Sequence, residues 1–198
     1  RSLVGSEMCI RDSLTTPNNV RITSIVNHIL QDKDGNLWFS TNGQGLFRYN
    51  LSKNYLEQYE FTSAFGIVAS TMADSDNQIW ALTNQGESGV YKLNKAENKF
   101  EPFGLLYNAG NHHSQALAML EDSEQTLWLG TWECGLQKID KYTRQTTTYL
   151  HPTDGKGVTH IHSLMEYAPH QLLIGSDDGL LLFNTLTEEY KPVSYTHL

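Results

Sequence analysis

The feature that most constrains this chain is a motif that recurs four times with fixed internal spacing. In the first three copies, a tryptophan follows an aspartate by six residues and a threonine follows the tryptophan by three. These columns hold Asp32, Trp38 and Thr41; Asp74, Trp80 and Thr83; and Asp122, Trp128 and Thr131. The fourth copy keeps the spacing with Tyr167, Leu173 and Ser176. The tryptophans lie 42 and 48 residues apart, and Leu173 follows 45 residues after Trp128, so the chain is a repeat protein.

Each copy has room for four short strands. Apolar residues recur two and six positions before each aspartate, and the tryptophan run that follows is bounded by polar turn residues. A third strand begins at a glycine and ends at a turn-forming Asn or Asp: Gly45 to Asn50, Gly89 to Asn94, Gly135 to Asp140 and Gly179 to Asn184. An aromatic residue nine positions later marks the fourth strand at Tyr59, Phe103 and Tyr149.

Four antiparallel strands at this period predict blades of a β-propeller. We therefore expect an all-β fold, a partial β-propeller of about four four-stranded antiparallel blades in an open arc. The blades should span about 20–61, 66–103, 114–149 and 159–191 of a domain covering 14–191. The Asp, Trp and Thr columns are assigned a structural role, since periodic aromatic residues wedge neighbouring blades together. An open arc should expose the outer faces of its first and last blades and make the isolated chain unstable.

The two ends of the chain share nothing with the repeat. Residues 1–13 (RSLVGSEMCIRDS) and 192–198 (PVSYTHL) resemble translated adapter sequences, and we interpret both as non-native. Cys9 and His197 then carry no function, and the native protein is expected to continue past both ends. The fourth copy would place Val193 in the fourth-strand column, inside the second of these strings.

Composition excludes several classes of function. The net charge of −8 argues against a nucleic-acid-binding surface, which needs clustered Lys and Arg. No apolar run approaches the roughly 20 residues of a membrane helix, and two cysteines make no disulfide framework.

Motifs with possible chemistry have structural explanations. The run from Asp32 to Asn36 resembles the start of a calcium loop, but Leu37 and Gly43 occupy the places of its glycine and glutamate, so a tight turn is expected. The histidine pairs 112–113 and 160/162 lack an accompanying cluster of carboxylates or cysteines, and Cys134 lacks a nucleophile signature. We predict no catalytic residue, metal or cofactor.

Blade geometry divides the loops between two rims. The turns joining strands 1–2 and 3–4 share one rim, and the 2–3 turns and inter-blade connections share the other. Variable loops on a rigid scaffold are the usual place for binding. The candidate ligand-binding residues on this second rim are Trp132, Glu133, Asn42, Gln44, Asn84, Gln85, Glu87, Asp177, Asp178, His112, His113 and His160, with His162 in the same loop as His160. Trp132 beside Glu133 suits a sugar face; the alternative is that Trp132 only packs on the next blade.

The Asp-x-Asp/Glu-Gly-x-Leu-Trp-x-x-Thr pattern, followed by Gly-Leu and Tyr/Ile-Asn/Asp, resembles the two-component regulator propeller repeat over about 20–191. The chain departs from it at Asn77, in place of the turn glycine, and in the fourth copy. The resemblance implies the periplasmic sensor region of a hybrid histidine kinase, with seven blades in the complete propeller. It implies an oligosaccharide ligand, and as partners the remaining blades and a downstream kinase of the same chain, in a homodimer.

Two other functions remain open. A propeller enzyme related to streptogramin-inactivating lyases has similar Asp-Gly-x-Trp runs and would place a catalytic His or Glu and a divalent metal on the rim. A propeller used only for structure or protein interaction would bind no glycan.

Overall fold

A computed structural model describes residues 21–61, 66–83, 89–105, 115–150 and 157–193. These residues form sixteen β-strands in four antiparallel sheets, and each sheet pairs its strands in chain order. Blade 1 contains β1 (Val26–Gln31), β2 (Leu37–Thr41), β3 (Leu46–Asn50) and β4 (Tyr55–Tyr59). Blade 2 contains β5 (Val68–Ala73), β6 (Ile79–Thr83), β7 (Gly89–Asn94) and β8 (Lys99–Leu105). Blade 3 contains β9 (Ala116–Glu121), β10 (Leu127–Thr131), β11 (Leu136–Ile139) and β12 (Thr146–Tyr149). Blade 4 contains β13 (Ile161–Ala168), β14 (Gln171–Ser176), β15 (Gly179–Asn184) and β16 (Tyr190–Pro192).

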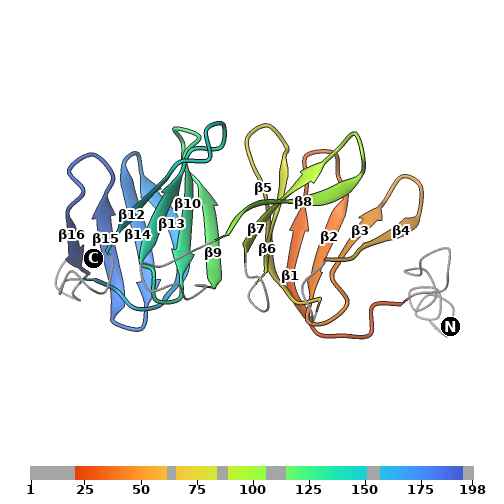
Figure 1. The fold of residues 1–198 in the computed structure, drawn as a ribbon, viewed down its shortest axis with the longest axis horizontal. Coiled ribbons are helices and arrows are strands. Elements are labelled where there is room, and N and C mark those ends of the chain that lie inside the picture. The colour runs from red at the N-terminus through yellow and green to blue at the C-terminus, as the bar shows by residue number, and fades with distance from the viewer. Residues whose placement is uncertain (1–20, 62–65, 84–88, 106–114, 151–156, 194–198) are drawn as a thin grey trace, which may run out of the picture.

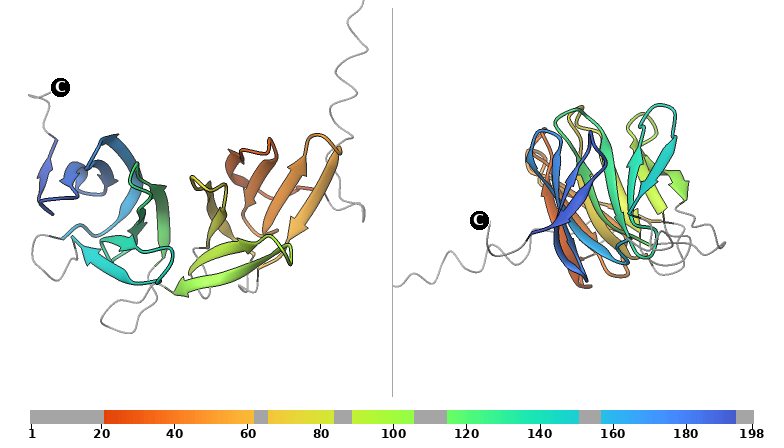
Figure 2. Two further views of the ribbon diagram at one scale, coloured as in Figure 1. Left: turned by 90° about the horizontal axis from the view of Figure 1, so that it is seen from above. Right: turned by 90° about the vertical axis from the view of Figure 1, so that its left-hand side faces the viewer.

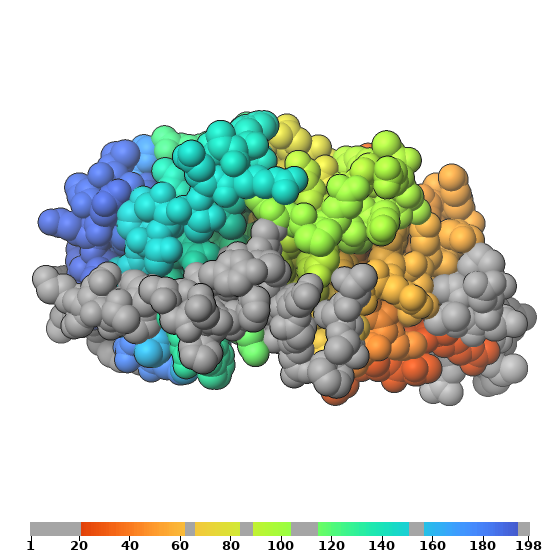
Figure 3. Space-filling model, viewed as in Figure 1, coloured from red at the N-terminus to blue at the C-terminus, as the bar shows by residue number. Residues whose placement is uncertain are grey.

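The four blades stand side by side in an open arc, which confirms the predicted fold class (Figures 1 and 2). The first strand of each blade lies nearest the middle of the arc and the fourth lies at the periphery (Figure 2). In the space-filling view, successive blades are in contact in chain order (Figure 3). Three apolar clusters fill the three joints, and each contains one of the repeated tryptophans, Trp38, Trp80 or Trp128.

The aspartate column builds the turn between strands 1 and 2. Oδ1 of Asp32 accepts the backbone N–H groups of Asp34 and Asn36 at 3.0 and 2.8 Å, and Oδ2 accepts the indole N–H of Trp38 at 2.8 Å. The same bonds recur in blades 2 and 3, where the indole distances are 3.0 and 2.7 Å. Both carboxylate oxygens of Asp32 therefore accept hydrogen bonds from the turn and the tryptophan that follows it, as predicted for a tight turn.

The departure at Asn77 has a conformational explanation. The equivalent positions Gly35, Asn77 and Gln125 all have positive φ, at 81°, 56° and 63°. Asparagine tolerates the left-handed region better than most residues, so it can stand where the repeat has glycine.

A basic residue on the third strand packs over each tryptophan ring. Arg48 lies 5.6 Å from the ring centroid of Trp38, and the equivalent distances are 5.2 Å for Lys92 over Trp80 and 5.9 Å for Lys138 over Trp128. Each basic residue is directly opposite its tryptophan in the strand register. The cation therefore covers the π-face of a ring whose N–H is held by the aspartate.

Blade 4 lacks all three members of this arrangement. Tyr167 stands in the aspartate column, Leu173 in the tryptophan column, and Leu182 pairs with Leu173 where the other blades have a basic residue. The three replacements are chemically linked, because an aliphatic side chain needs neither an N–H acceptor nor a covering cation.

The first strands show which faces of the arc lack a neighbour. The residue three before the aspartate column faces the preceding blade, as Met119 and Leu164 do, whereas the residue two before it faces the following blade. Ile29 and Met165 occupy these two positions in the first and last blades and are 60% and 59% exposed. Exposure of the outer faces was predicted from the four-blade arc.

The register of the repeat continues to Val193. The pairs Leu46–Tyr59 and Leu136–Tyr149 join strands 3 and 4 in blades 1 and 3, and the Val193 N–H donates to the Leu180 carbonyl at 2.8 Å in the same place. Pro192, predicted to begin a non-native end, lies within β16. Residues 1–13 and 194–198 lie outside the described residues.

Candidate functional site

The loops divide between two rims as the strand order predicts. The turns between strands 1–2 and 3–4 lie along the upper edge in Figure 1, and the β14–β15 turn lies along the lower edge. The upper edge carries the regular aspartate turns. The lower edge, called here the binding rim, carries most of the candidate residues. Among those candidates, Asn84, Gln85, Glu87, His112 and His113 lie outside the described residues.

Gln44 holds the segment that leads into blade 1. Its Oε1 accepts the backbone N–H groups of Thr23 and Ser24 at 2.8 and 2.9 Å, and its Nε2 donates to the Arg21 carbonyl at 3.0 Å. Nearby, the Asn42 backbone N–H donates to the Ile25 carbonyl at 2.9 Å. Both ends of the Gln44 amide therefore have partners within the protein.

Trp132 and His160 bring blades 3 and 4 together on the binding rim. Their ring centroids are 3.7 Å apart with 31° between the ring planes, and the two residues also form an isolated β-bridge. The indole nevertheless remains 41% exposed. The two interpretations of Trp132 are thus compatible, since one side chain both packs on the next blade and presents aromatic surface to solvent.

Asp177 joins two histidines across the β14–β15 turn. Its Oδ2 is hydrogen-bonded to Nδ1 of His160, and its Oδ1 lies 2.7 Å from Nε2 of His162. The Asp177 backbone N–H also donates to the His160 carbonyl at 3.3 Å. We call Trp132, His160, His162 and Asp177 the rim cluster.

Local backbone geometry positions this cluster. Trp132 directly follows β10, and its N–H donates to the Gln115 carbonyl at 2.9 Å. The next residue, Glu133, has a φ of 70°, and its N–H donates to the Thr159 carbonyl at 2.7 Å. The 2–3 turn of blade 3 is therefore tied to the connection that enters blade 4. Glu133 and Asp178 are exposed on the same rim.

The histidine contacts favour the ionised form of the Asp177 carboxyl. Hydrogen bonds from His160 and then His162 lower the pKa of Asp177 below its ordinary value, against a smaller opposing effect of desolvation. The carboxylate charge is thus present throughout the neutral range.

Only part of this arrangement was predicted from the sequence. Trp132, Asp177 and His160 were candidates as separate residues, and His162 was expected in the same loop as His160 but lies within β13. The pairing of Asp177 with both histidines was not predicted. Histidines at alternate positions suggest a shared strand face. The β-bulge between Ile161 and Ser163, and the distance along the chain to Asp177, hide the pairing from sequence alone.

Other chemistry is not assembled in the described part of the chain. No group of three or more His, Cys, Asp or Glu residues there is placed to hold a metal ion. Cys134 is buried, and its backbone N–H donates to Oγ1 of Thr131 at 3.1 Å. Within the same ranges, no helix has the length and apolar character needed to cross a membrane.

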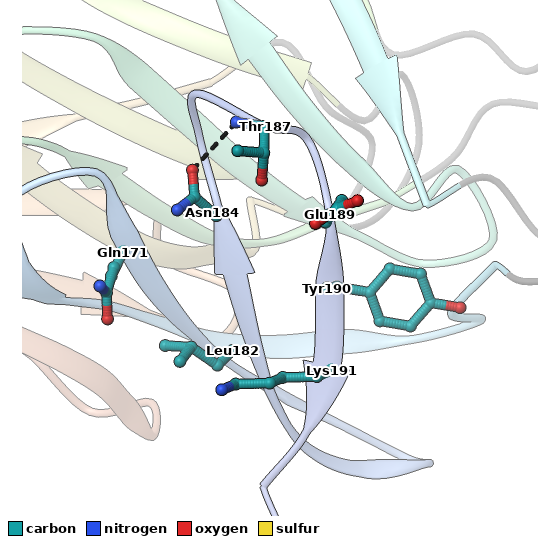
Figure 4. A pocket seen from close by; sticks show the side chains of 7 residues that line it. All are labelled: Gln171, Leu182, Asn184, Thr187, Glu189, Tyr190 and Lys191. Carbon is teal, nitrogen blue, oxygen red and sulfur yellow. Dashed lines mark hydrogen bonds between the residues drawn. The ribbon is translucent and has the colours of Figure 1, made fainter.

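A hollow of about 350 Å³ lies on the outer face of blade 4 (Figure 4). Gln171 and Leu182 line it, and their equivalents in blade 1 are Asn36 and Arg48. Asn36 and Arg48 line a cavity of about 160 Å³ whose opposite wall is blade 2. The hollow therefore corresponds to one wall of the groove that lies between two blades elsewhere in the arc. Its presence does not indicate a ligand site.

Comparisons with known proteins agree on the repeat and the fold. A family model described as "Two component regulator propeller" matches residues 18–43. Histidine kinase P4 of Formosa agariphila is 28% identical over 180 residues, covering 86% of this chain and 13% of that protein. The extracellular domain of a one-component system of B. thetaiotaomicron is 24% identical with a TM-score of 0.70, covering 86% of this chain and 22% of that one.

The fold is shared with an enzyme as well. Virginiamycin B lyase of Staphylococcus aureus is 14% identical with a TM-score of 0.68, covering 90% of this chain and 58% of the lyase. Likeness at this identity concerns the fold alone. The present chain spans about an eighth of the histidine kinase that it matches. The family model matches one copy of the motif, and the same motif recurs in register through blades whose fold is shared with the solved extracellular domain.

Proposed function

We propose that this chain is a non-enzymatic, ligand-sensing part of a periplasmic two-component sensor. In this proposal, its binding rim recognises an oligosaccharide, and the signal passes to a histidine kinase in the same protein, acting as a homodimer. The kinase relative and the extracellular domain with the same fold support the sensor context. The rim cluster is the observation that supports ligand binding, because it joins an aromatic surface to fixed polar groups.

The chemistry of the rim cluster suits a sugar. A sugar ring has an apolar face that packs on an indole and hydroxyl groups that bond to carboxylate and imidazole. The exposed part of Trp132 offers the first contact, and Asp177 with its two histidines offers the second. Glu133 and Asp178 add acceptors on the same rim.

Isothermal titration of this 198-residue chain against a panel of oligosaccharides tests the proposal. We expect one or more glycans to bind, and Trp132→Ala to weaken that binding at least about tenfold, equivalent to about 1.4 kcal/mol. Tyr142→Ala is the matched control, because Tyr142 is an aromatic residue 80% exposed in the turn after β11, on the opposite rim. Equal loss of affinity in both variants, or binding by neither the chain nor its variants, would contradict glycan recognition and favour a protein-interaction propeller.

The lyase alternative rests on the shared fold. Quinupristin, which is bound in the solved virginiamycin B lyase, provides a direct assay. We expect its chromatographic retention time to be unchanged after incubation with the chain and a divalent metal salt, because ring opening by elimination would give a linear isomer of the same mass that elutes differently. Turnover that a chelator abolishes would establish the enzyme in place of the sensor.

A further inference from the structure

The pairing of one carboxylate with two imidazoles determines where their protons lie. An ionised carboxylate only accepts hydrogen bonds, so the ring nitrogen facing each oxygen must carry a hydrogen. Asp177 faces Nδ1 of His160 and Nε2 of His162. The two histidines are therefore held in opposite tautomers, with the hydrogen on Nδ1 in the first and on Nε2 in the second.

The outward nitrogens then have a defined role. In a neutral imidazole whose one nitrogen is a donor, the other is an acceptor. Nε2 of His160 and Nδ1 of His162 are therefore hydrogen-bond acceptors within the rim cluster. The ring of His160 is held in place by its stacking on that indole at 3.7 Å.

Among the described residues, the charged residues that flank the cluster in sequence are acidic. Glu133, which follows Trp132, and Asp178, which follows Asp177, are exposed, and no Lys or Arg occurs in the described stretch from 157 to 178. The whole chain carries a net charge of −8. With both imidazoles neutral, the rim presents acceptors and negative charge.

We infer that the rim cluster selects a ligand that donates hydrogen bonds and carries no negative charge, such as a neutral hexose oligosaccharide, over a uronate or sulfated glycan. Asp177 acts as the positioning residue, because it fixes both imidazoles. The inference deepens the proposed function and rests on it for the ligand class. The tautomer assignment is independent of that function.

Nitrogen NMR of the histidine side chains in the intact chain tests the tautomers. At about pH 7.5, we expect a protonated Nδ1 in His160 and a protonated Nε2 in His162. His160→Gln and His162→Gln assign the signals. Asp177→Asn leaves a single carbonyl acceptor and adds an N–H donor, so one of the two rings should change tautomer. Identical histidine spectra for the intact chain and Asp177→Asn would overturn the inference.

Titration with paired probes tests the ligand class. Neutral galactohexaose and the hexamer of galacturonic acid have similar size but differ in charge. We expect the neutral hexaose to bind at least about tenfold more tightly at about pH 7.5. Tighter binding of the galacturonate hexamer would overturn the selection. If the chain binds neither these two probes nor any other glycan but shows the expected histidine tautomers, the proposed function is wrong and the tautomer assignment still holds.

Discussion

The indole N–H of Trp38 donates to Oδ2 of Asp32 at 2.8 Å, across the six residues that separate them in the chain. The other carboxylate oxygen accepts two backbone N–H groups of the intervening turn. One aspartate thus closes the turn and satisfies a tryptophan that is 1% exposed. The fixed spacing between the aspartate and the tryptophan in the sequence allows one carboxylate to bond both the turn amides and the indole N–H.

Removing the third such aspartate should destabilise the chain. Asp122→Ala leaves the buried indole N–H of Trp128 and two turn N–H groups without their acceptor, which should cost about 2–4 kcal/mol, since one unsatisfied buried donor costs about 1–3 kcal/mol. Urea unfolding followed by tryptophan fluorescence measures the loss. Asp178→Ala, an exposed aspartate with the same truncation, should change stability by less than about 0.5 kcal/mol. Equal values for the two variants would contradict the role of the carboxylate.

These contacts explain why the scaffold could be predicted and the rim cluster only in part. The Asp, Trp and Thr columns interact within a few residues, as when Oγ1 of Thr131 donates to the Gly135 carbonyl at 2.7 Å, so their spacing is fixed and visible. The contact of Asp177 with His162 depends on how the β14–β15 turn meets the start of β13. Loop lengths there vary between blades, so no periodic sequence pattern indicates this contact. The change from a basic residue to Leu182 is visible in the sequence, but only the strand register shows that Leu182 pairs with Leu173.

The tryptophan and its covering cation should behave as a coupled pair. Trp128→Leu should cost about 3–5 kcal/mol by analogy with other large core truncations. Lys138→Leu alone removes the cation 5.9 Å from the ring centroid. The double variant reproduces the Leu173–Leu182 pair of blade 4, and its loss should fall below the sum of the single losses by about 0.5–1 kcal/mol. A double-mutant cycle by urea unfolding gives this term. Strict additivity would show that the cation does not interact with the ring.

The joint between blades 2 and 3 should lose stability in strong alkali. Burial alone would lower the pKa of the Lys141 amine, but its hydrogen bond to Glu121 and the charges of Asp74 and Asp76 outweigh burial and raise the pKa above the ordinary 10.5. A raised folded-state pKa stabilises the fold fully below pH 10.5, and this contribution disappears as the pH rises through the higher folded value.

Thermal unfolding between neutral pH and about pH 11 tests this alkaline loss. The melting temperature of the unaltered chain should fall above pH 10.5 more steeply than that of Lys141→Met, which lacks the titrating group. Lys53→Met, at an exposed lysine, controls for the general effect of alkali and should follow the unaltered chain. Parallel curves for the unaltered chain and Lys141→Met would refute the assignment.

Gly135 should tolerate no side chain. Its φ is 68°, and an added Cβ would lie 2.4 Å from the Tyr149 carbonyl oxygen and 2.6 Å from that of Leu150. Gly135→Ala should therefore cost more than the roughly 1 kcal/mol expected from left-handed backbone alone. Gly179→Ala is the matched control, because Gly179 also has positive φ, at 102°, but no atom lies within 4 Å of its Cβ position. Equal losses in urea unfolding would show that the close contacts are relieved by small shifts.

The exposed edges of the arc should make the isolated chain self-associate. Ile29 and Met165 are 60% and 59% exposed at positions where the equivalent side chains pack on a neighbouring blade. Exposure of such apolar faces to water favours association between copies of the chain. Sedimentation velocity over a range of protein concentrations should show oligomers of the unaltered chain, and fewer for the double variant Ile29→Lys with Met165→Lys. Leu51→Lys, which places the same charge at a leucine 52% exposed in the turn after β3, should leave association unchanged. A monomer at all concentrations with a sharp, reversible melting transition would contradict this prediction, because the arc would then be stable without covered outer faces.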